Sequence, residues 1–375
     1  MRILQRGRCA AVVVACILGL VGPCFGQSEG TTAVLDRIGF TAALDAGYSA
    51  RFNGYSTYEP LLQTQIPVDY DTKTLSVFDL HVRAGVLESE LIGFDYQTSL
   101  PRTDFQEEAL AYREDRAFGL EKYTFGVDTT PLWLLLLPDD ASWAVKRVLA
   151  LRFRSIRELS QSNASVTEPS LGVPTTPTYG DATSFAPLEA GASYSFKTRY
   201  RYNSLSLPLV FFVEDRGRVN VGVAQWSFSR SYAARPSSLG GEQVVFDATN
   251  ETTALIAELY IDLHQGGLAG FEFDMFYGYG LHNNWTGDEV DVNRLFFPSG
   301  DEQVDIANHN LQFRTSYPFT FFESRDRLAA ALKVGLLANT FTTSFSNVEE
   351  PNGEGDGFRK RDWIINPSLR LSVSY

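Results

Sequence analysis

Histidine, together with nearby serine or acid side chains, is the group with which this chain would most readily do chemistry. The sequence has four histidines: His81, His264, His282 and His309. A serine hydrolase needs a histidine that accepts the serine proton and a third group that orients the ring. His81 has Asp79 and Arg83 two residues away, and His309 has Ala307 and Leu311. Because neither has a serine at that spacing, we do not expect an enzyme.

Metal and thiol chemistry find equally little support. The stretch "PNGEGDG" at 351–357 spaces Asn352, Glu354 and Asp356 like the start of a calcium loop, but the glutamate that closes such a loop at its twelfth position is replaced by Trp363. The three cysteines, Cys9, Cys16 and Cys24, all lie near the N-terminus. We therefore expect no metal site and no cofactor.

The N-terminal segment has the pattern of a secretory signal peptide. Arg2, Arg6 and Arg8 precede an apolar run over 10–21, and Gly26 offers a small residue for cleavage. We predict a signal peptide at 1–26 and one mature domain at 27–375, which then has no cysteine. Because the removed segment carries three arginines and no acid, the formal net charge of −13 becomes −13 − 3 = −16. Such an acidic chain lacks the basic footprint of a nucleic-acid-binding protein.

Apolar and polar residues alternate along most of the mature chain, which predicts β-strands. In "SYSFKTRYRY", at 193–202, four of the five even positions are aromatic, with Thr198 as the fifth, and Lys197, Arg199 and Arg201 stand at odd positions. The apolar phase then moves to odd positions from Leu205 onward, which indicates either a bulge in one strand or two strands that meet at Asn203. The segment 139–160 fits either a strand or an amphipathic helix. No run beyond the signal is long enough for a spanning helix.

Short and long polar connections alternate along the chain. Short turns are expected at 87–90, 138–141, 214–218, 264–267 and 323–327, and long loops at 53–72, 101–119, 158–189, 233–251, 282–303 and 346–361. Eleven connections of this kind join twelve strands, as in a transmembrane barrel with its termini on the short-turn side. We predict an all-β fold, an antiparallel up-and-down barrel of about twelve strands, with ten or fourteen as alternatives. The long loops would be extracellular and the short turns periplasmic.

The C-terminal "LRLSVSY" carries a resemblance to a known class. Its apolar residues at every second position and its final aromatic ring, Leu369, Leu371, Val373 and Tyr375, resemble the terminal signal of Gram-negative outer-membrane β-barrel proteins. The resemblance implies a location in the bacterial outer membrane, contact with outer-membrane lipid, and recognition of this segment by the barrel-assembly machinery. The hairpin "SLPLVFFVEDRGRVNVGV" at 206–223 is loosely similar to one in FadL-type transporters.

Charged residues opposite the apolar faces are the candidate functional residues, because they would face the lumen. We expect a basic wall and an acidic wall there: Arg152, Arg154, Lys197, Arg199 and Arg201 against Glu258, Asp262, Glu272 and Asp274. Separated walls create a transverse field that selects small polar solutes. The sequence thus favours a porin-like or ligand-guided channel. The alternatives are a structural or adhesion barrel whose lumen charges pair and close it, and, third, an outer-membrane hydrolase.

Overall fold

The computed structural model describes the strands of a closed β-barrel and parts of their connections. The described residues are 39–59, 64–69, 75–86, 89–99, 102–109, 112–132, 150–168, 193–212, 217–235, 244–263, 266–287, 305–324, 328–346 and 358–374. The predicted signal peptide, the calcium-like loop at 351–357 and Tyr375 lie outside them.

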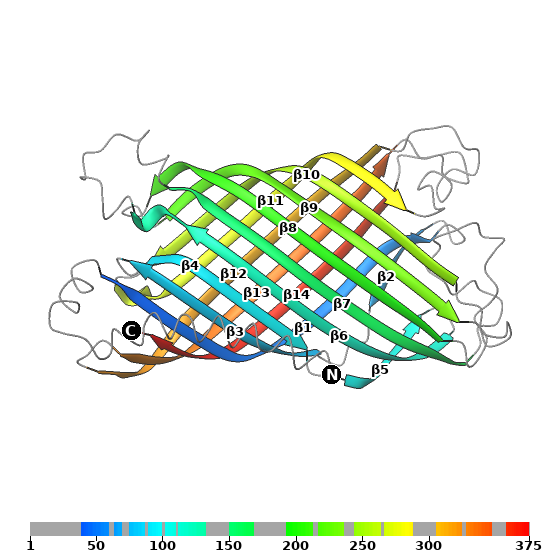
Figure 1. Cartoon of the computed structure of the whole chain (residues 1–375), viewed down its shortest axis with the longest axis horizontal. Helices are drawn as coiled ribbons and strands as arrows, with labels where there is room; N and C mark the ends of the chain where they lie inside the picture. The colour runs from blue at the N-terminus through cyan, green and yellow to red at the C-terminus, as the bar shows by residue number, and fades with distance from the viewer. Residues whose placement is uncertain are drawn as a thin grey trace.

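Twelve long antiparallel strands form the barrel wall (Figure 1). In chain order they are β1 Thr41–Glu59, β3 Leu75–Val86, β4 Ser89–Ser99, β6 Tyr112–Asp128, β7 Arg152–Glu168, β8 Ser193–Phe212, β9 Gly217–Arg235, β10 Val244–Leu263, β11 Phe271–Gly287, β12 Asp305–Glu323, β13 Ala329–Ser346 and β14 Phe358–Ser374. Two shorter strands, β2 Thr64–Asp69 and β5 Arg102–Ala109, pair with β1 and β6. One short 3₁₀-helix, η2 Gly266–Leu268, lies between β10 and β11.

Pairing between the last and the first long strand closes the wall. β14 lies antiparallel to β1 from Ala43↔Ser374 to Ser56↔Arg361. Every other long strand pairs with its neighbours in chain order, so no long strand has a free edge. The predicted all-β fold and the count of twelve are confirmed, and the alternatives of ten and fourteen are excluded. None of the helical segments within the described residues is long and apolar enough to cross a membrane.

Most strands are longer than the sequence pattern suggested. β1, β7 and β9 run on to Glu59, Glu168 and Arg235, into segments predicted as long loops. Nine to eleven residues suffice to cross a bilayer, yet β8 and β10 have 20 each. The surplus carries polar residues, so backbone pairing continues where apolar alternation no longer marks a strand.

The structure answers the two questions that the sequence left open, at 139–160 and within 193–212. The described part of 139–160 is strand from Arg152 onward, whereas 133–149 lie outside the described residues. β6 ends at Asp128, whose side chain accepts the backbone N–H of Thr130 at 3.0 Å. β8 is one continuous strand, and its irregularity lies between Pro208 and Val210 rather than at Asn203.

The wall separates an apolar exterior from a polar interior. In β8 the odd-numbered residues Leu205, Leu207 and Leu209 are between 44 % and 47 % exposed, while Ser204 and Ser206 between them are buried. Equivalent exposed residues are Val221 and Val223 on β9, Leu255 on β10, Leu332 and Val334 on β13, and Leu369, Leu371 and Val373 on β14. An apolar belt around a closed sheet is the surface that a bilayer requires, because every backbone group of the belt is paired within the wall.

Candidate functional site in the barrel interior

Charged side chains from most of the wall meet in the interior. We call this group the charge layer and define it by Asp45, His81, Arg83, Glu90, Asp95, Arg152, Arg154, Glu258, Glu272, Asp274, Arg314 and Lys333. Period-two alternation places them inside, because their strand neighbours carry the apolar belt. Two residues of the predicted basic wall, Arg152 and Arg154, thus share one network with three of the predicted acidic wall: Glu258, Glu272 and Asp274.

Several ion pairs join strands that are not neighbours, and three of them show how far the contacts reach across the interior. Arg83 on β3 donates to Glu272 on β11 at 2.6 Å, although β1, β14, β13 and β12 lie between these strands. Arg152 on β7 donates to Asp274 on β11 at 2.6 Å, and Arg51 on β1 donates to Glu158 on β7 at 2.9 Å. Contacts of this length tie separate parts of the wall to one another.

Glu272 is the most connected acid of the charge layer. Besides Arg83 it accepts Lys333 Nζ at 3.1 and 3.2 Å and the Ser316 hydroxyl at 2.8 Å. Lys333 and Arg83 also lie 3.6 and 3.8 Å from a carboxylate oxygen of Asp45. The two cations therefore share two acids, and neither is left with a single partner.

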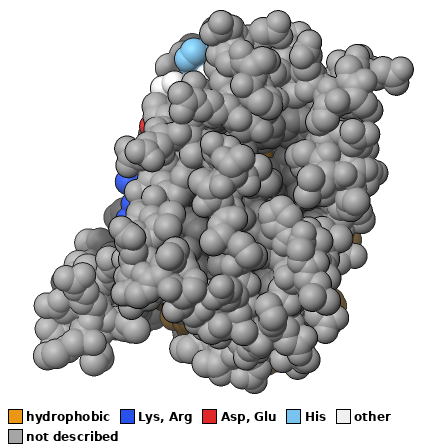
Figure 2. Space-filling view, turned by 90° about the vertical axis from the view of Figure 1, so that its right-hand side faces the viewer, with side chains coloured by type: hydrophobic (Ala, Val, Ile, Leu, Met, Phe, Trp, Pro, Cys, Tyr) orange, Lys and Arg blue, Asp and Glu red, His pale blue; other side chains and the backbone are white. Residues whose placement is uncertain are grey.

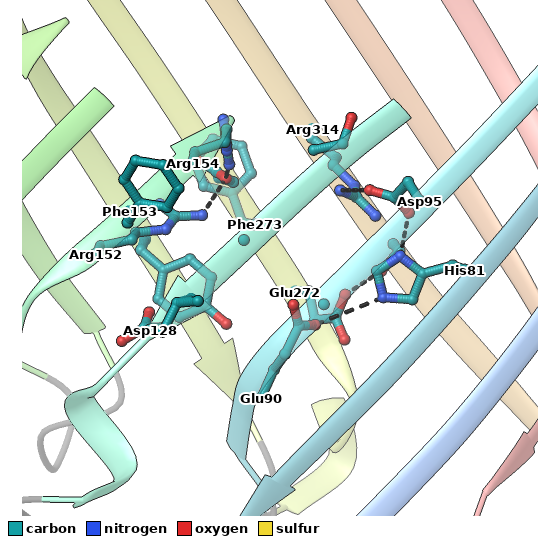
Figure 3. Close-up of a pocket in the computed structure, with 17 residues that line it drawn as sticks. His81, Glu90, Asp95, Asp128, Arg152, Phe153, Arg154, Glu272, Phe273 and Arg314 are labelled. Atoms are coloured by element: carbon teal, nitrogen blue, oxygen red, sulfur yellow. Dashed lines mark hydrogen bonds and ion pairs between the residues drawn. The ribbon is translucent and has the colours of Figure 1, made fainter. Parts of the chain in front are cut away.

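His81 lies in a second group of the same layer (Figure 3). Its Nδ1 is hydrogen-bonded to Asp95, and its Nε2 lies 3.6 Å from a Glu90 carboxylate oxygen. Arg314 lies 3.6 Å from the other Asp95 oxygen. His81 is buried in the interior. Among the described residues, the groups against this ring are the carboxylates of Asp95 and Glu90.

A small cavity lies between these groups. Its volume is about 80 Å³, and three arginines, His81, five carboxylates and Tyr260 contribute to its lining. Figure 3 shows Arg152, Arg154 and Asp128 on one side and His81, Glu90 and Glu272 on the other. A polar space of this size holds a few water molecules, and groups of both signs face it.

An apolar cluster fills a second level of the interior. We call it the aromatic layer and define it by Ile156, Tyr202, Ala224, Trp226, Ala254, Ile256 and Phe276, with Tyr200, Phe228 and Phe341 packed against it. Trp226 is 1 % exposed, and its ring centroid lies 6.2 Å from that of Phe341. The centroids of Tyr202 and Phe276 lie 5.6 Å apart. These rings come from β8, β9, β11 and β13, so they pack across the interior.

Part of the predicted basic wall is on the other side of the sheet. Arg199 and Arg201 are exposed, whereas their neighbour Tyr202 is buried in the aromatic layer. β8 keeps its phase through Asn203, so the positions that continue Leu205 toward the N-terminus of the strand face outward. The prediction that put Lys197, Arg199 and Arg201 in the lumen is wrong.

The other residues of the two predicted walls face the interior. Arg152 lies between Asp274 and Glu258, 3.6 Å from the latter, and Arg154 bonds to Asp274. Asp262 is buried and accepts the Tyr260 hydroxyl at 3.3 Å. Sequence reasoning missed Lys333, Arg314 and the aromatic layer. The alternation of β12 and β13 does carry the signal, because the nearest residues in phase are small or polar: Gln312 and Ser316 beside Arg314, and Ala331 and Gly335 beside Lys333.

No protein-family model and no curated protein sequence matches the chain. Among solved structures it is similar to the translocator domain of the autotransporter NalP from Neisseria meningitidis, with 11% identity, a TM-score of 0.38, and coverage of 98% of this chain and 99% of that one. It is also similar to the outer-membrane protease OmpT from Escherichia coli, with 8% identity, a TM-score of 0.32, and coverage of 90% of this chain and 96% of that one. A third similar structure is the toluene transporter TodX from P. putida, with 8% identity, a TM-score of 0.29, and coverage of 89% of this chain and 90% of that one.

Scores this low carry no argument about activity. The structural class follows from the fold and its surfaces. A closed sheet of twelve antiparallel strands has an apolar belt on its outside and charged side chains in its interior. The chain is a membrane-spanning β-barrel of the bacterial outer-membrane kind.

Proposed function

We propose that this barrel does not act as an open pore, and that it serves as a structural or interaction protein whose work is done at its surfaces. The main observation in support of this proposal is the set of ion pairs that cross the interior. Passage of ions needs a continuous path for water. A guanidinium and a carboxylate 2.6 Å apart, as in Arg83 and Glu272, leave no room for a hydrated ion between them.

The aromatic layer supports the same proposal at a second level. Trp226, Phe276 and Phe341 meet across the interior and exclude water from the space between them. An ion that passed the charge layer would have to enter this apolar level without its hydration shell, which is unfavourable. Two barriers of different chemistry thus lie in series.

Single-channel recording of the refolded protein in a planar bilayer tests the proposal. We expect no steady conductance from the wild-type barrel and conductance from a variant that opens both levels, Arg83→Ala/Glu272→Ala/Trp226→Ala/Phe341→Ala. The boiling-dependent shift on a gel verifies that each sample is folded. A steady open level in the folded wild-type protein would overturn the proposal.

The cavity in the charge layer favours one second candidate, the guided passage of a small zwitterion. Arg152 and Arg154 face Glu90 and Glu272 across it, so a solute with both charges would find a partner for each. Vesicles that contain the protein should then take up a small amino acid faster than a neutral sugar of similar size. Equal rates, or no uptake of either, exclude this candidate.

A further inference from the structure

Four basic side chains form a group on the outside of the barrel. We call it the outer basic patch and define it by Arg157 on β7 and Lys197, Arg199 and Arg201 on β8. The three arginines are exposed and Lys197 is half-buried. Figure 2 looks at the barrel from the right-hand end of Figure 1, and basic side chains are visible there at the left edge, on the wall that faces the viewer in Figure 1.

The arginines of the patch lie close enough to one another for their positive charges to repel. Arg157 is the direct cross-strand partner of Arg201, and Arg199 lies at the diagonal position. Like charges at such positions repel each other. The Arg157 guanidinium donates to the carbonyl oxygens of Ile156 at 2.9 Å and Tyr202 at 3.2 Å, which holds it against the wall.

No carboxylate pairs with the three arginines within the part of the chain that the structure describes. The nearest acids on the outer face lie at the flanks of the patch. Glu121 on β6 accepts the Tyr123 hydroxyl, and Glu251 on β10 is separated from Arg201 by Ser227. Several cations held together without an anion indicate that the anion comes from outside the chain.

The patch begins where the apolar belt ends. Along β8 the outward positions read Leu209, Leu207, Leu205, then Asn203 and Arg201. Arg201 lies four residue steps along the strand from Leu205, a distance of roughly 13 Å at ~3.3 Å per residue. With a strand tilt of about 40° this is roughly 10 Å along the membrane normal, which reaches the head-group region. On β9 the neighbouring outward residues are also polar: Gln225, Ser227 and Ser229.

We propose that the outer basic patch binds phosphate groups on the lipid head groups of the adjoining leaflet. Arginine presents paired N–H donors that match phosphate oxygens, and the serines beside the patch add hydroxyl donors. Continuity with the apolar belt selects a lipid as the source, because the acyl chains of a lipid bound here lie against Leu205 and Val223.

Titration of the detergent-solubilised protein with phosphatidic acid, followed by native mass spectrometry, tests the proposal. Each basic residue near a charged lipid surface contributes about fivefold in affinity, so Arg157→Gln/Arg199→Gln/Arg201→Gln should weaken binding roughly a hundredfold. Binding of phosphatidylcholine, which has no net charge, should change far less. A triple variant that folds and still binds phosphatidic acid like the wild type would overturn the proposal.

Two matched comparisons keep the test decisive. If the triple variant does not fold, Arg201→Gln alone should weaken binding about fivefold, whereas Arg361→Gln, an exposed arginine on β14 outside the patch, should leave it unchanged. Equal effects of these two substitutions contradict the proposal. Inorganic phosphate should not displace the lipid, and displacement at equal concentration would identify a site for free phosphate instead.

Discussion

The ion pair between Arg83 and Glu272 gives the sharpest test of the closed interior. Their side chains are 21 % and 26 % exposed, so most of each is shielded from water. In Glu272→Gln the cations Arg83 and Lys333 both lose a charged partner; the acid that they still share among the described residues is Asp45, at 3.8 and 3.6 Å. Loss of one partner in a buried network lowers the free energy of unfolding by about 3 kcal/mol.

The reverse substitution should be milder. In Arg83→Met the acid Glu272 keeps Lys333 and Ser316, so we expect a loss of about 1.5 kcal/mol, between the effects of exposed and buried pairs. The double variant should lose about 3 kcal/mol, no more than Glu272→Gln alone, which is a coupling energy of about 1.5 kcal/mol.

Urea unfolding of the barrel in lipid vesicles, followed by tryptophan fluorescence, measures all four free energies. The single and double variants are compared at one ionic strength, because salt weakens exposed pairs more than shielded ones. If the two single losses add in the double variant to within ~0.5 kcal/mol, the side chains do not interact across the interior and the reasoning for a closed lumen fails.

Two further substitutions test the wall itself. An added Cβ at Gly222 would clash with the Leu205 carbonyl oxygen and would lie 2.6 Å from the Ser206 Cα, so Gly222→Ala should lower the free energy of unfolding by ~1–3 kcal/mol. The control is Gly119→Ala, whose added Cβ has its nearest contact 3.9 Å away. It should change the free energy of unfolding by no more than ~0.5 kcal/mol in the same urea assay. Leu207→Lys places a charge in the apolar belt and should cost ~2–4 kcal/mol. Ser227→Lys, beyond the belt, places a lysine opposite Arg201 and should cost less than ~1 kcal/mol, and equal losses for the two lysines would put the belt elsewhere.

The closed ring could be predicted because it depends on short-range signals. The alternation at the C-terminal strand puts Leu369, Leu371 and Val373 outward, where they are 51 %, 51 % and 40 % exposed. Their register against β1 follows from the same alternation, because a shift by one residue would turn them inward. Their recognition by the barrel-assembly machinery stays a prediction, and Tyr375 lies outside the described residues.

The outward face of β8 could not be assigned from residue type alone. Beyond the apolar belt the exterior is polar, while the interior at that level is filled by Tyr200 and Tyr202. The rule that aromatic residues face lipid and charges face the lumen therefore reverses within one strand. Only the unbroken period of two from Leu205 to Arg201 gives the correct side.

The partners across the interior were beyond the reach of sequence reasoning. Arg83 and Glu272 are 189 residues apart, and they meet only because of how the ring closes. A pattern of charges on two strands fixes which face each occupies, but not which strands lie opposite each other. The same inward charges are therefore compatible with an open field or with pairs, and the cross-lumen distances decide between them.

The two layers fill the interior with different chemistry. A wall that only needed filling would be served as well by apolar side chains, since replacing a buried ion pair by packed hydrophobic residues is often neutral or stabilising. The aromatic layer follows that rule around Trp226. The charge layer does not, and it keeps a polar cavity beside His81 and Arg152. The interior therefore combines a level filled by apolar packing with a level of paired charges around a polar cavity.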